Sequence, residues 1–252
     1  MSTPSAHMVG RRWFLTQTGR GAVGIAVLGF AGCSDSGEPA NQRTAPANSG
    51  PAEAATKLAW SRVNLDFVAA YVLVRGREAA VVDTGVGGSA DAIGAVLDEA
   101  GPGWAGVRHV VLTHKHPDHV GSIGDVLTAA TRATGYVGAG DLPEVDAPSR
   151  LRPLSDGDEV FGLHVVATPG HTAGHLAAFD ADTGVLVAGD ALTNTDGLTG
   201  SNPQYTEDKK AAVASVRKLA RLVPRTILVG HGEPVVDGAA AALRELASSL
   251  PS

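Results

Sequence analysis

Cysteine, clusters of basic residues and long apolar runs are scarce in this sequence of 252 residues. A single cysteine excludes a disulfide framework and any cysteine-rich zinc module. A formal charge of -6 without a block of basic residues argues against nucleic acid as the main partner. The mostly apolar run at residues 21–32 would span only about 20 Å as a helix, short of the roughly 30 Å hydrocarbon core of a bilayer. It therefore does not predict a stable transmembrane helix.

The residues that are plentiful are typical of a folded domain with a tail. Hydrophobic residues make up 44% of the chain, which is enough to bury a core, and the length fits one α/β domain. The chain has nine histidines, so a metal site built from imidazole and carboxylate groups is a reasonable hypothesis.

The first 33 residues have the features of an export signal. Arg11 and Arg12 precede the apolar run, and small residues lead from it to Cys33. The arginine pair resembles a twin-arginine signal, and residues 30–33 resemble a bacterial lipobox, in which the cysteine is lipidated after cleavage. We expect an exported protein on the outer face of the cytoplasmic membrane, anchored through Cys33, or a periplasmic or extracellular one if Cys33 is not lipidated. The alternative is an uncleaved amphipathic or disordered N-terminus.

Residues 34–56 are rich in Ser, Gly, Pro, Ala and Asn and have almost no large apolar side chains. This composition predicts a flexible tether. The expected organisation is therefore a signal at residues 1–33, a tether at 34–56 and a catalytic domain at 57–252.

From residue 57 onward, short apolar strands alternate with amphipathic helices. A hairpin is expected around Gly76, and Ser89 is placed to cap a helix whose apolar residues recur every three to four positions. Strands are expected at residues 68–74, 79–82, 107–112, 160–167, 176–179, 184–188 and 226–229, and further helices around 123–130, 207–222 and 239–250. Two β-rich halves that each end in helices predict a layered α+β domain with helices outside its sheets. No repeat period indicates a solenoid or a propeller.

The segment at residues 113–119, Thr-His-Lys-His-Pro-Asp-His, directly follows the strand expected at 107–112. In an extended chain, residues two positions apart point the same way, so His114 and His116 can converge on one ion.

The residue after this pair, Pro117, disfavours a helical conformation at His116 and turns the chain. Asp118 and His119 then fall at or near the start of the next helix, so an acid and an imidazole can point toward a second ion. These ligand types suit zinc, iron and manganese. The alternative is a polar loop whose histidines only cap and hydrogen-bond, but three histidines and an aspartate within six residues favour metal binding.

Three further candidates lie where the same pocket would need them. His171, Asp190 and His231 each follow an apolar run and stand beside glycine, which lets backbones approach a site closely. Each alone could be an ordinary turn residue. Together with segment 113–119 they predict one metal pocket.

This order of histidines and aspartates resembles the full ligand set of the metallo-β-lactamase superfamily, and the resemblance covers about residues 57–250. It implies a four-layer αββα sandwich with a dinuclear metal site at one edge. It also implies a role for each ligand: His114, His116 and His171 on the first metal, Asp118, His119 and His231 on the second, and Asp190 as the bridge.

The resemblance gives roles to two residues outside the ligand set. Asp83, at a strand end, resembles the acid that orients a ligand histidine. His175 resembles a frequent additional histidine, for which a structural hydrogen bond and a substrate contact are equally open. No role is expected for His7, His109 or His164.

The implied chemistry is hydrolysis. Two divalent ions, zinc or else iron or manganese, would share a water, lower its pKa and present a bridging hydroxide. They would also stabilise the charge that develops on the substrate. Asp118 is the candidate catalytic residue, which would orient the nucleophile and move a proton to the leaving group. The expected substrate is a small ester, thioester, lactone, amide or phosphodiester.

Several related activities rank lower. In this family a bridging acid such as Asp190 is typical of glyoxalase-like, lactonase-like and nuclease-like members, whereas true β-lactamases usually lack it. The length and charge of the chain argue against a nuclease. Two alternatives stay open: an iron-dependent persulfide dioxygenase with a mononuclear site, and a surface lipoprotein that binds metal without turnover. Asp118 argues against the second, because a pure binding site needs no acid beside the water.

Residues 193–205 are rich in Asn, Gly, Thr and Pro and predict a loop near the site. Asn194 and Tyr205 are its candidate substrate contacts. The sequence does not identify the substrate, because specificity resides in loops that vary around a fixed core.

Overall fold

The structure is a computed structural model, and it describes residues 57–147, 149 and 151–251. Cys33 and the predicted signal and tether lie outside the described residues. Among the residues that it does describe, no helix is long and apolar enough to cross a membrane.

Six strands form the first sheet, in the order β1-β2-β3-β4-β5-β6. β1, β2 and β3 are an antiparallel meander, and β4, β5 and β6 run parallel to β3. The strands are β1 (Ala59–Leu65), β2 (Val68–Arg75), β3 (Glu78–Val82), β4 (Val107–Leu112), β5 (Thr134–Gly138) and β6 (Arg152–Leu154). The connections contain α1 (Ala90–Ala100), α2 (Gly103–Gly106), α3 (Pro117–Val120), α4 (Ile123–Ala129) and the 3-10 turn η1 (Leu142–Glu144).

The second sheet has five strands in the order β13-β10-β9-β8-β7. They are β7 (Glu159–Val160), β8 (Leu163–Ala167), β9 (Leu176–Asp180), β10 (Val185–Gly189) and β13 (Thr226–Val229). A small hairpin of β11 (Leu192–Thr193) and β12 (Thr199–Gly200) follows β10, and the helices of this half are α5 (Lys209–Ala220) and α6 (Ala239–Ser249).

Alternation along the central strands explains the layers. On β2, Tyr71 and Leu73 belong to the apolar cluster between the two sheets, whereas Ala70 and Val72 belong to the cluster under α1 and α4. Successive strand residues point to opposite faces, so a strand that is apolar on both faces needs cover on both.

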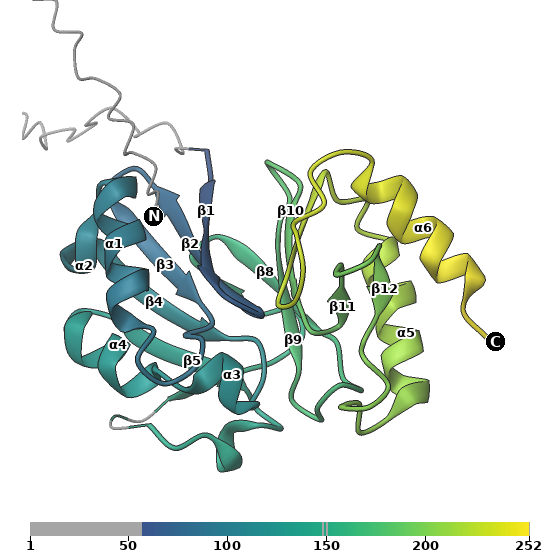
Figure 1. The fold of residues 1–252 in the computed structure, drawn as a ribbon, viewed down its shortest axis with the longest axis horizontal. Coiled ribbons are helices and arrows are strands. Elements are labelled where there is room, and N and C mark those ends of the chain that lie inside the picture. The colour runs from purple at the N-terminus through teal and green to yellow at the C-terminus, as the bar shows by residue number, and fades with distance from the viewer. Residues whose placement is uncertain (1–56, 148, 150, 252) are drawn as a thin grey trace, which may run out of the picture. The chain divides into compact units, whose positions relative to one another are not determined.

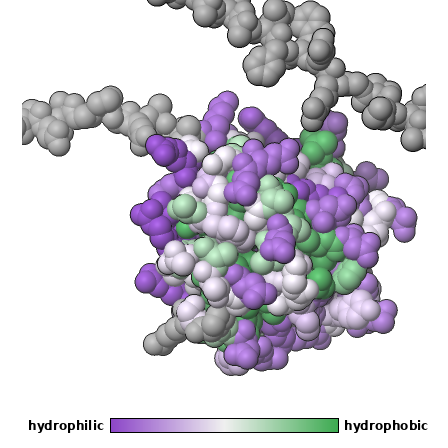
Figure 2. Space-filling model, turned by 60° about the vertical axis from the view of Figure 1, so that its left-hand side comes forward, coloured by the Kyte–Doolittle hydropathy of each residue, from purple (hydrophilic) through white to green (hydrophobic). Residues whose placement is uncertain are grey.

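The second sheet is covered in the same way. Val216 and Leu219 of α5 and Leu243 of α6 pack with Leu186 and Ile227 on its outer face. Figure 1 shows the resulting order of helices, sheet, sheet and helices, which confirms the predicted αββα sandwich. The face brought forward in Figure 2 carries many hydrophilic residues with smaller hydrophobic areas between them.

The single strand predicted at residues 160–167 is wrong. It is two strands, β7 and β8, joined by a tight turn at Phe161 and Gly162, which have φ values of 56° and 71°. Sequence periodicity did not indicate this turn because Phe161 is a bulky residue, which rarely adopts positive φ.

Two helix starts also differ in detail from expectation. Ser89 occupies the N-cap of α1, but its hydroxyl donates to the Val86 carbonyl and makes no cap bond to the helix. α5 begins at Lys209 rather than 207, because the Asp208 side chain accepts hydrogen bonds from the backbone N–H groups of Lys210 and Ala211.

Candidate metal centre

The predicted ligands lie at the ends of strands that share a direction. β8 and β10 both pair antiparallel with β9, and β13 pairs parallel with β10, so these three strands run the same way. His171, Asp190 and His231 follow their carboxyl ends. The segment from His114 to His119 follows β4 of the other sheet, and within each group of three donors the ligand atoms lie within 4.8 Å of one another.

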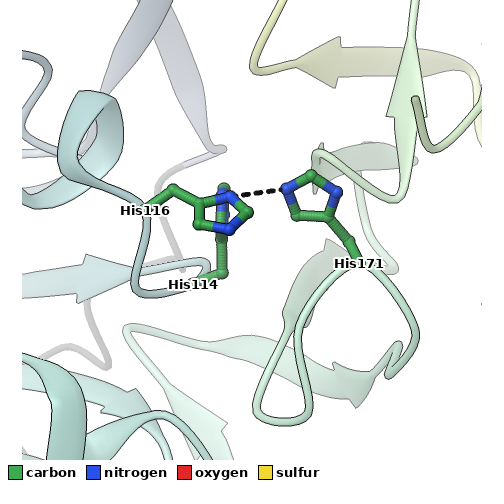
Figure 3. A group of neighbouring side chains, drawn as sticks. All are labelled: His114, His116 and His171. Carbon is green, nitrogen blue, oxygen red and sulfur yellow. Dashed lines mark hydrogen bonds between the residues drawn. The ribbon is translucent and has the colours of Figure 1, made fainter. Parts of the chain in front are cut away.

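The first group of donors is His114, His116 and His171. Nε2 of His114 lies 3.0 Å from Nδ1 of His116, and Nε2 of His171 lies 2.9 Å from the same atom. Figure 3 shows His116 and His171 approaching each other from opposite segments of the chain, with His114 beside them. Three imidazole nitrogens thus face one point.

The second group is Asp118, His119 and His231. Oδ2 of Asp118 is 3.4 Å from Nε2 of His231 and 3.8 Å from Nε2 of His119. As expected from the proline that precedes them, Asp118 and His119 stand in the first turn of α3, with His116 in extended conformation at its N-cap.

Asp190 touches both groups. Its Oδ2 lies 3.5 Å from Nε2 of His171 and 3.1 Å from Nε2 of His231, and its Oδ1 lies 3.4 Å from Nε2 of His119. A carboxylate with both oxygens directed at the two donor groups is placed to bridge them.

Hydrogen bonds on the outer side fix which nitrogen of His114, His119 and His231 faces inward. The Thr113 hydroxyl donates to the Asp83 carboxylate, so Nδ1–H of His114 must donate to that hydroxyl. Nδ1 of His119 lies 2.8 Å from Oδ2 of Asp83 and Nδ1 of His231 lies 2.7 Å from the Phe67 carbonyl, so both donate outward. The inner atom in each case is Nε2.

A chain of hydroxyls does the same for His171. Thr206 donates to the Asn202 carbonyl, so the Ser201 hydroxyl must donate to Thr206 and accept from Nδ1–H of His171. This support comes from residues far along the sequence, and sequence reasoning did not find it.

His175 is structural. The backbone N–H of Asp190 donates to its Nε2 at 3.0 Å, so its Nδ1–H donates to the Thr168 hydroxyl. Burial lowers the pKa of His175 to about 3, which keeps it neutral and able to accept that bond. Of the two roles left open, this geometry supports the hydrogen-bonding one.

Gly189, which precedes Asp190, has φ 50°, and a Cβ at this position would meet Thr113 and His175, so glycine is needed at this turn.

Asp141 supports two of the ligand loops, and the sequence did not reveal it. Its buried carboxylate accepts from the backbone N–H of Lys115, from the Thr172 hydroxyl and from the backbone N–H of Gly174. It thereby joins the loop of His114 and His116 to the loop of His171. No local motif marks it, because its partners are 26 to 33 residues away.

Bound metal ions would satisfy the donor atoms better than contacts among the donors do. Nε2 of His119 and Oδ1 of Asp190 are buried 3.4 Å apart, and neither has a hydrogen-bond partner among the described residues; a bound cation would satisfy both. Nδ1 of His116 faces two imidazole nitrogens and could share a proton with only one. Nitrogen and carboxylate donors suit zinc, iron and manganese.

Histidine pKa values are shifted in opposite directions in the two donor groups. Burial lowers the pKa of His114 well below its usual range and that of His171 to about 4, so both have a free lone pair at neutral pH. The hydrogen bond to Asp118 raises the pKa of His231 to about 11. Burial opposes protonation of His119, but the carboxylates of Asp190 and Asp83 outweigh it and raise its pKa to about 9. The protein thus favours positive charge beside these carboxylates.

A cavity of about 760 Å³ opens onto the donors, and Tyr205 lines it as expected. Asn194 is not in its lining. Its side chain donates to the Glu233 carbonyl and its backbone N–H to the His231 carbonyl, so it supports the segment that presents His231. Asn202, in the loop predicted at 193–205, lines the cavity together with Tyr205.

A model of the metallo-β-lactamase superfamily matches residues 63–231, which contain all seven donors. The "Probable metallo-hydrolase YflN" of Bacillus subtilis (strain 168) is 31% identical over 221 residues, covering 68% of this chain and 82% of that protein. A hydroxyacylglutathione hydrolase of Ectopseudomonas mendocina is 38% identical over 120 residues, 46% of this chain and 43% of that enzyme.

Two solved structures are similar to this chain in both sequence and fold. A metallo-β-lactamase family protein of Thermus thermophilus has a TM-score of 0.62 at 28% identity and covers 76% of this chain and 78% of that one. A protein crystallised in a di-iron-bound form has a TM-score of 0.58 at 27% identity, covering 69% and 92%. The chain belongs to the metallo-β-lactamase superfamily, and within it carries a His/Asp cluster consistent with a dinuclear metal site.

Proposed function

We propose that this metallo-hydrolase works with two divalent metal ions, zinc in the first instance, and cleaves an ester, thioester, lactone or amide in a small molecule. The observation that supports it most is the position of Asp190 between two complete donor groups. We assign His114, His116 and His171 to the first ion, Asp118, His119 and His231 to the second, and Asp190 to both.

Two bound ions supply Lewis acidity and make water a nucleophile near neutral pH. The residues of the chain would hold and orient these ions. The inward nitrogens of four ligand histidines are fixed by hydrogen bonds to Asp83, Thr113, Ser201 and the Phe67 carbonyl. Asp141 connects the loop of His114 and His116 to the loop of His171.

The exposure and ionisation of Asp118 support a role in proton transfer. Both aspartates line the cavity, but the Asp118 side chain is 26% exposed whereas that of Asp190 is 7% exposed. Burial alone would raise the pKa of Asp118, but the contact with His231 lowers it, so the carboxylate is ionised at neutral pH. It can accept a proton from the nucleophile and pass it to the leaving group.

Replacement of Asp118 by alanine tests this role. We expect a loss of hydrolysis of at least about 100-fold, in line with general acid–base catalysis, with the first ion largely retained. The matched control is Asp125→Ala, because Asp125 also lies in the first turn of a short helix but is exposed and outside the cavity. Full activity in Asp118→Ala would contradict the proposal.

The same donors could hold iron, and a structurally similar protein was solved in a di-iron form. Metal analysis, combined with a measurement of oxygen consumption when a persulfide is added, distinguishes hydrolysis from the persulfide dioxygenase reaction. Two ions per chain and no oxygen uptake support hydrolysis; one iron per chain with oxygen uptake supports the dioxygenase.

We also propose export by the twin-arginine route with Cys33 as the lipid anchor, on the basis of Arg11, Arg12 and the residues around the cysteine. Fractionation of cells that express Arg11→Lys plus Arg12→Lys tests the route. Retention of the variant inside the cell supports it, and unchanged export refutes it.

A further inference from the structure

Three apolar side chains line the cavity over the metal centre. Phe67, in the turn between β1 and β2, is 59% exposed, and its ring stacks on His231 at 6.1 Å with an interplanar angle of 9°. Val86 and Pro117 line the cavity with it. At the mouth of a site, an exposed phenylalanine offers a surface on which an apolar group can pack.

Four further lining residues, outside the proposed ligand set, are polar but uncharged. Thr193, Thr195, Asn202 and Tyr205 bring hydroxyl and amide groups from the β11–β12 hairpin and the loop that follows. These groups can hydrogen-bond a neutral substrate, but none provides a positive charge.

No lysine or arginine lines this cavity among the residues that the structure describes. Two cations on neighbouring segments are engaged elsewhere. Arg62 binds Glu233 and the Gly232 carbonyl, and Lys115 binds Glu144 and Glu207.

A third nearby cation, Lys209, lines a separate, adjoining cavity of about 520 Å³ between the β11–β12 hairpin and α5. The charged groups in the lining of the larger cavity are therefore the proposed metal ligands alone.

We infer that the substrate is an ester or lactone whose acyl part is apolar and uncharged, and that acyl groups bearing a carboxylate or phosphate are poor substrates. This inference rests on the proposed function and narrows it. A remote carboxylate in this cavity would lose water without gaining a cationic partner, whereas an alkyl chain would bury apolar surface on Phe67, Val86 and Pro117.

Two esters of equal length test the inference with the zinc-loaded full chain. One is 4-nitrophenyl pentanoate, and the other is mono-4-nitrophenyl glutarate, which has a carboxylate in place of the terminal methyl group. We expect kcat/KM to be at least about tenfold higher for the pentanoate, a difference of about 1.4 kcal/mol in transition-state binding.

Variants locate the source of the preference. Phe67→Ala should lower kcat/KM for the pentanoate more than for the glutarate, and Thr195→Arg, at a lining position in the loop after β11, should raise it for the glutarate. Val236→Ala is the matched control, because Val236 is an exposed valine outside the cavity. Metal content measured on each variant shows that the centre is intact.

The outcomes are distinct. Equal or better hydrolysis of the glutarate by the unaltered chain overturns this inference and leaves the metallo-hydrolase in place. Hydrolysis of neither ester by a chain with two ions also overturns the inference, and the proposed function itself fails only if that chain hydrolyses no thioester, lactone or amide either.

Discussion

At the scale of single residues, the ligands and their supports differ in how they can be recognised. Histidines two positions apart after a strand, with an acid and a histidine in the next helical turn, are a local pattern, and the structure brings them together. Asp141 and Ser201 act only through partners distant in sequence, and Phe67 supports His231 through its backbone carbonyl, which every residue type has. Their roles follow from topology, so the sequence alone could not show them.

Asp141 gives a prediction at this scale. Asp141→Ala should weaken metal binding by about 10- to 100-fold, because it frees the loops that carry His114, His116 and His171 from each other. Competition with a chromophoric chelator measures the affinity. Asp146→Ala, which removes a nearby aspartate, is the control; equal affinities in both variants would show that Asp141 does not position the ligands.

The pH dependence of metal binding follows from the raised pKa values of His119 and His231, about 9 and 11. In the metal-free protein both hold a proton at pH 7, and an ion on Nε2 must displace it. Affinity for the second ion should therefore rise with pH between about 6 and 8.5 and fall as the pH is lowered. Calorimetric titration in buffers of different ionisation enthalpy measures the released protons; binding without proton release would contradict this account.

At the scale of elements, the strands with uninterrupted apolar runs and the amphipathic helices were predictable. β1 and β5 were not, since β1 contains Arg62 and Asn64 and β5 contains Gly135 and Gly138, which weaken any strand pattern. Helix starts depend on which polar group bonds the backbone, and this is a matter of geometry: Asp208 caps α5, whereas Ser89 turns to Val86.

The cap of α5 is coupled to the metal centre. The backbone N–H groups of Glu207 and Asp208 donate to the carbonyls of His171 and Gly170, so the start of this helix holds the His171 loop. Asp208→Ala should lower the free energy of unfolding by about 1 kcal/mol through loss of the cap. Chemical denaturation measures it, with Asp237→Ala as control, because that exposed acid makes no cap bond to α6. A loss of equal size in both variants would contradict the prediction.

At the scale of the whole described domain, the metal centre is where the two halves of the sandwich meet. His114 to His119 come from the first sheet, and His171, Asp190 and His231 from the second. The layered α+β architecture was predictable from apolar strands and helices, but the convergence of these particular strand ends depends on how the sheets pack, which the resemblance to a known family supplied and periodicity did not.

Removal of metal should therefore destabilise the whole domain. An ion present at about 100 times its dissociation constant stabilises the folded state by about 2.7 kcal/mol, so a chelator should lower the melting temperature by several degrees. Calorimetry before and after chelation, and again after zinc is restored, measures the change. An unaltered melting temperature would show that the two halves do not depend on bound metal.

The central claim is a dinuclear hydrolytic site, and one titration tests it most directly: the rate of hydrolysis of 4-nitrophenyl pentanoate by the metal-free full chain as zinc is added. We predict a rate that rises and levels off at two equivalents of zinc per chain. A rate that levels off at one equivalent, or that does not depend on added zinc, would contradict the claim.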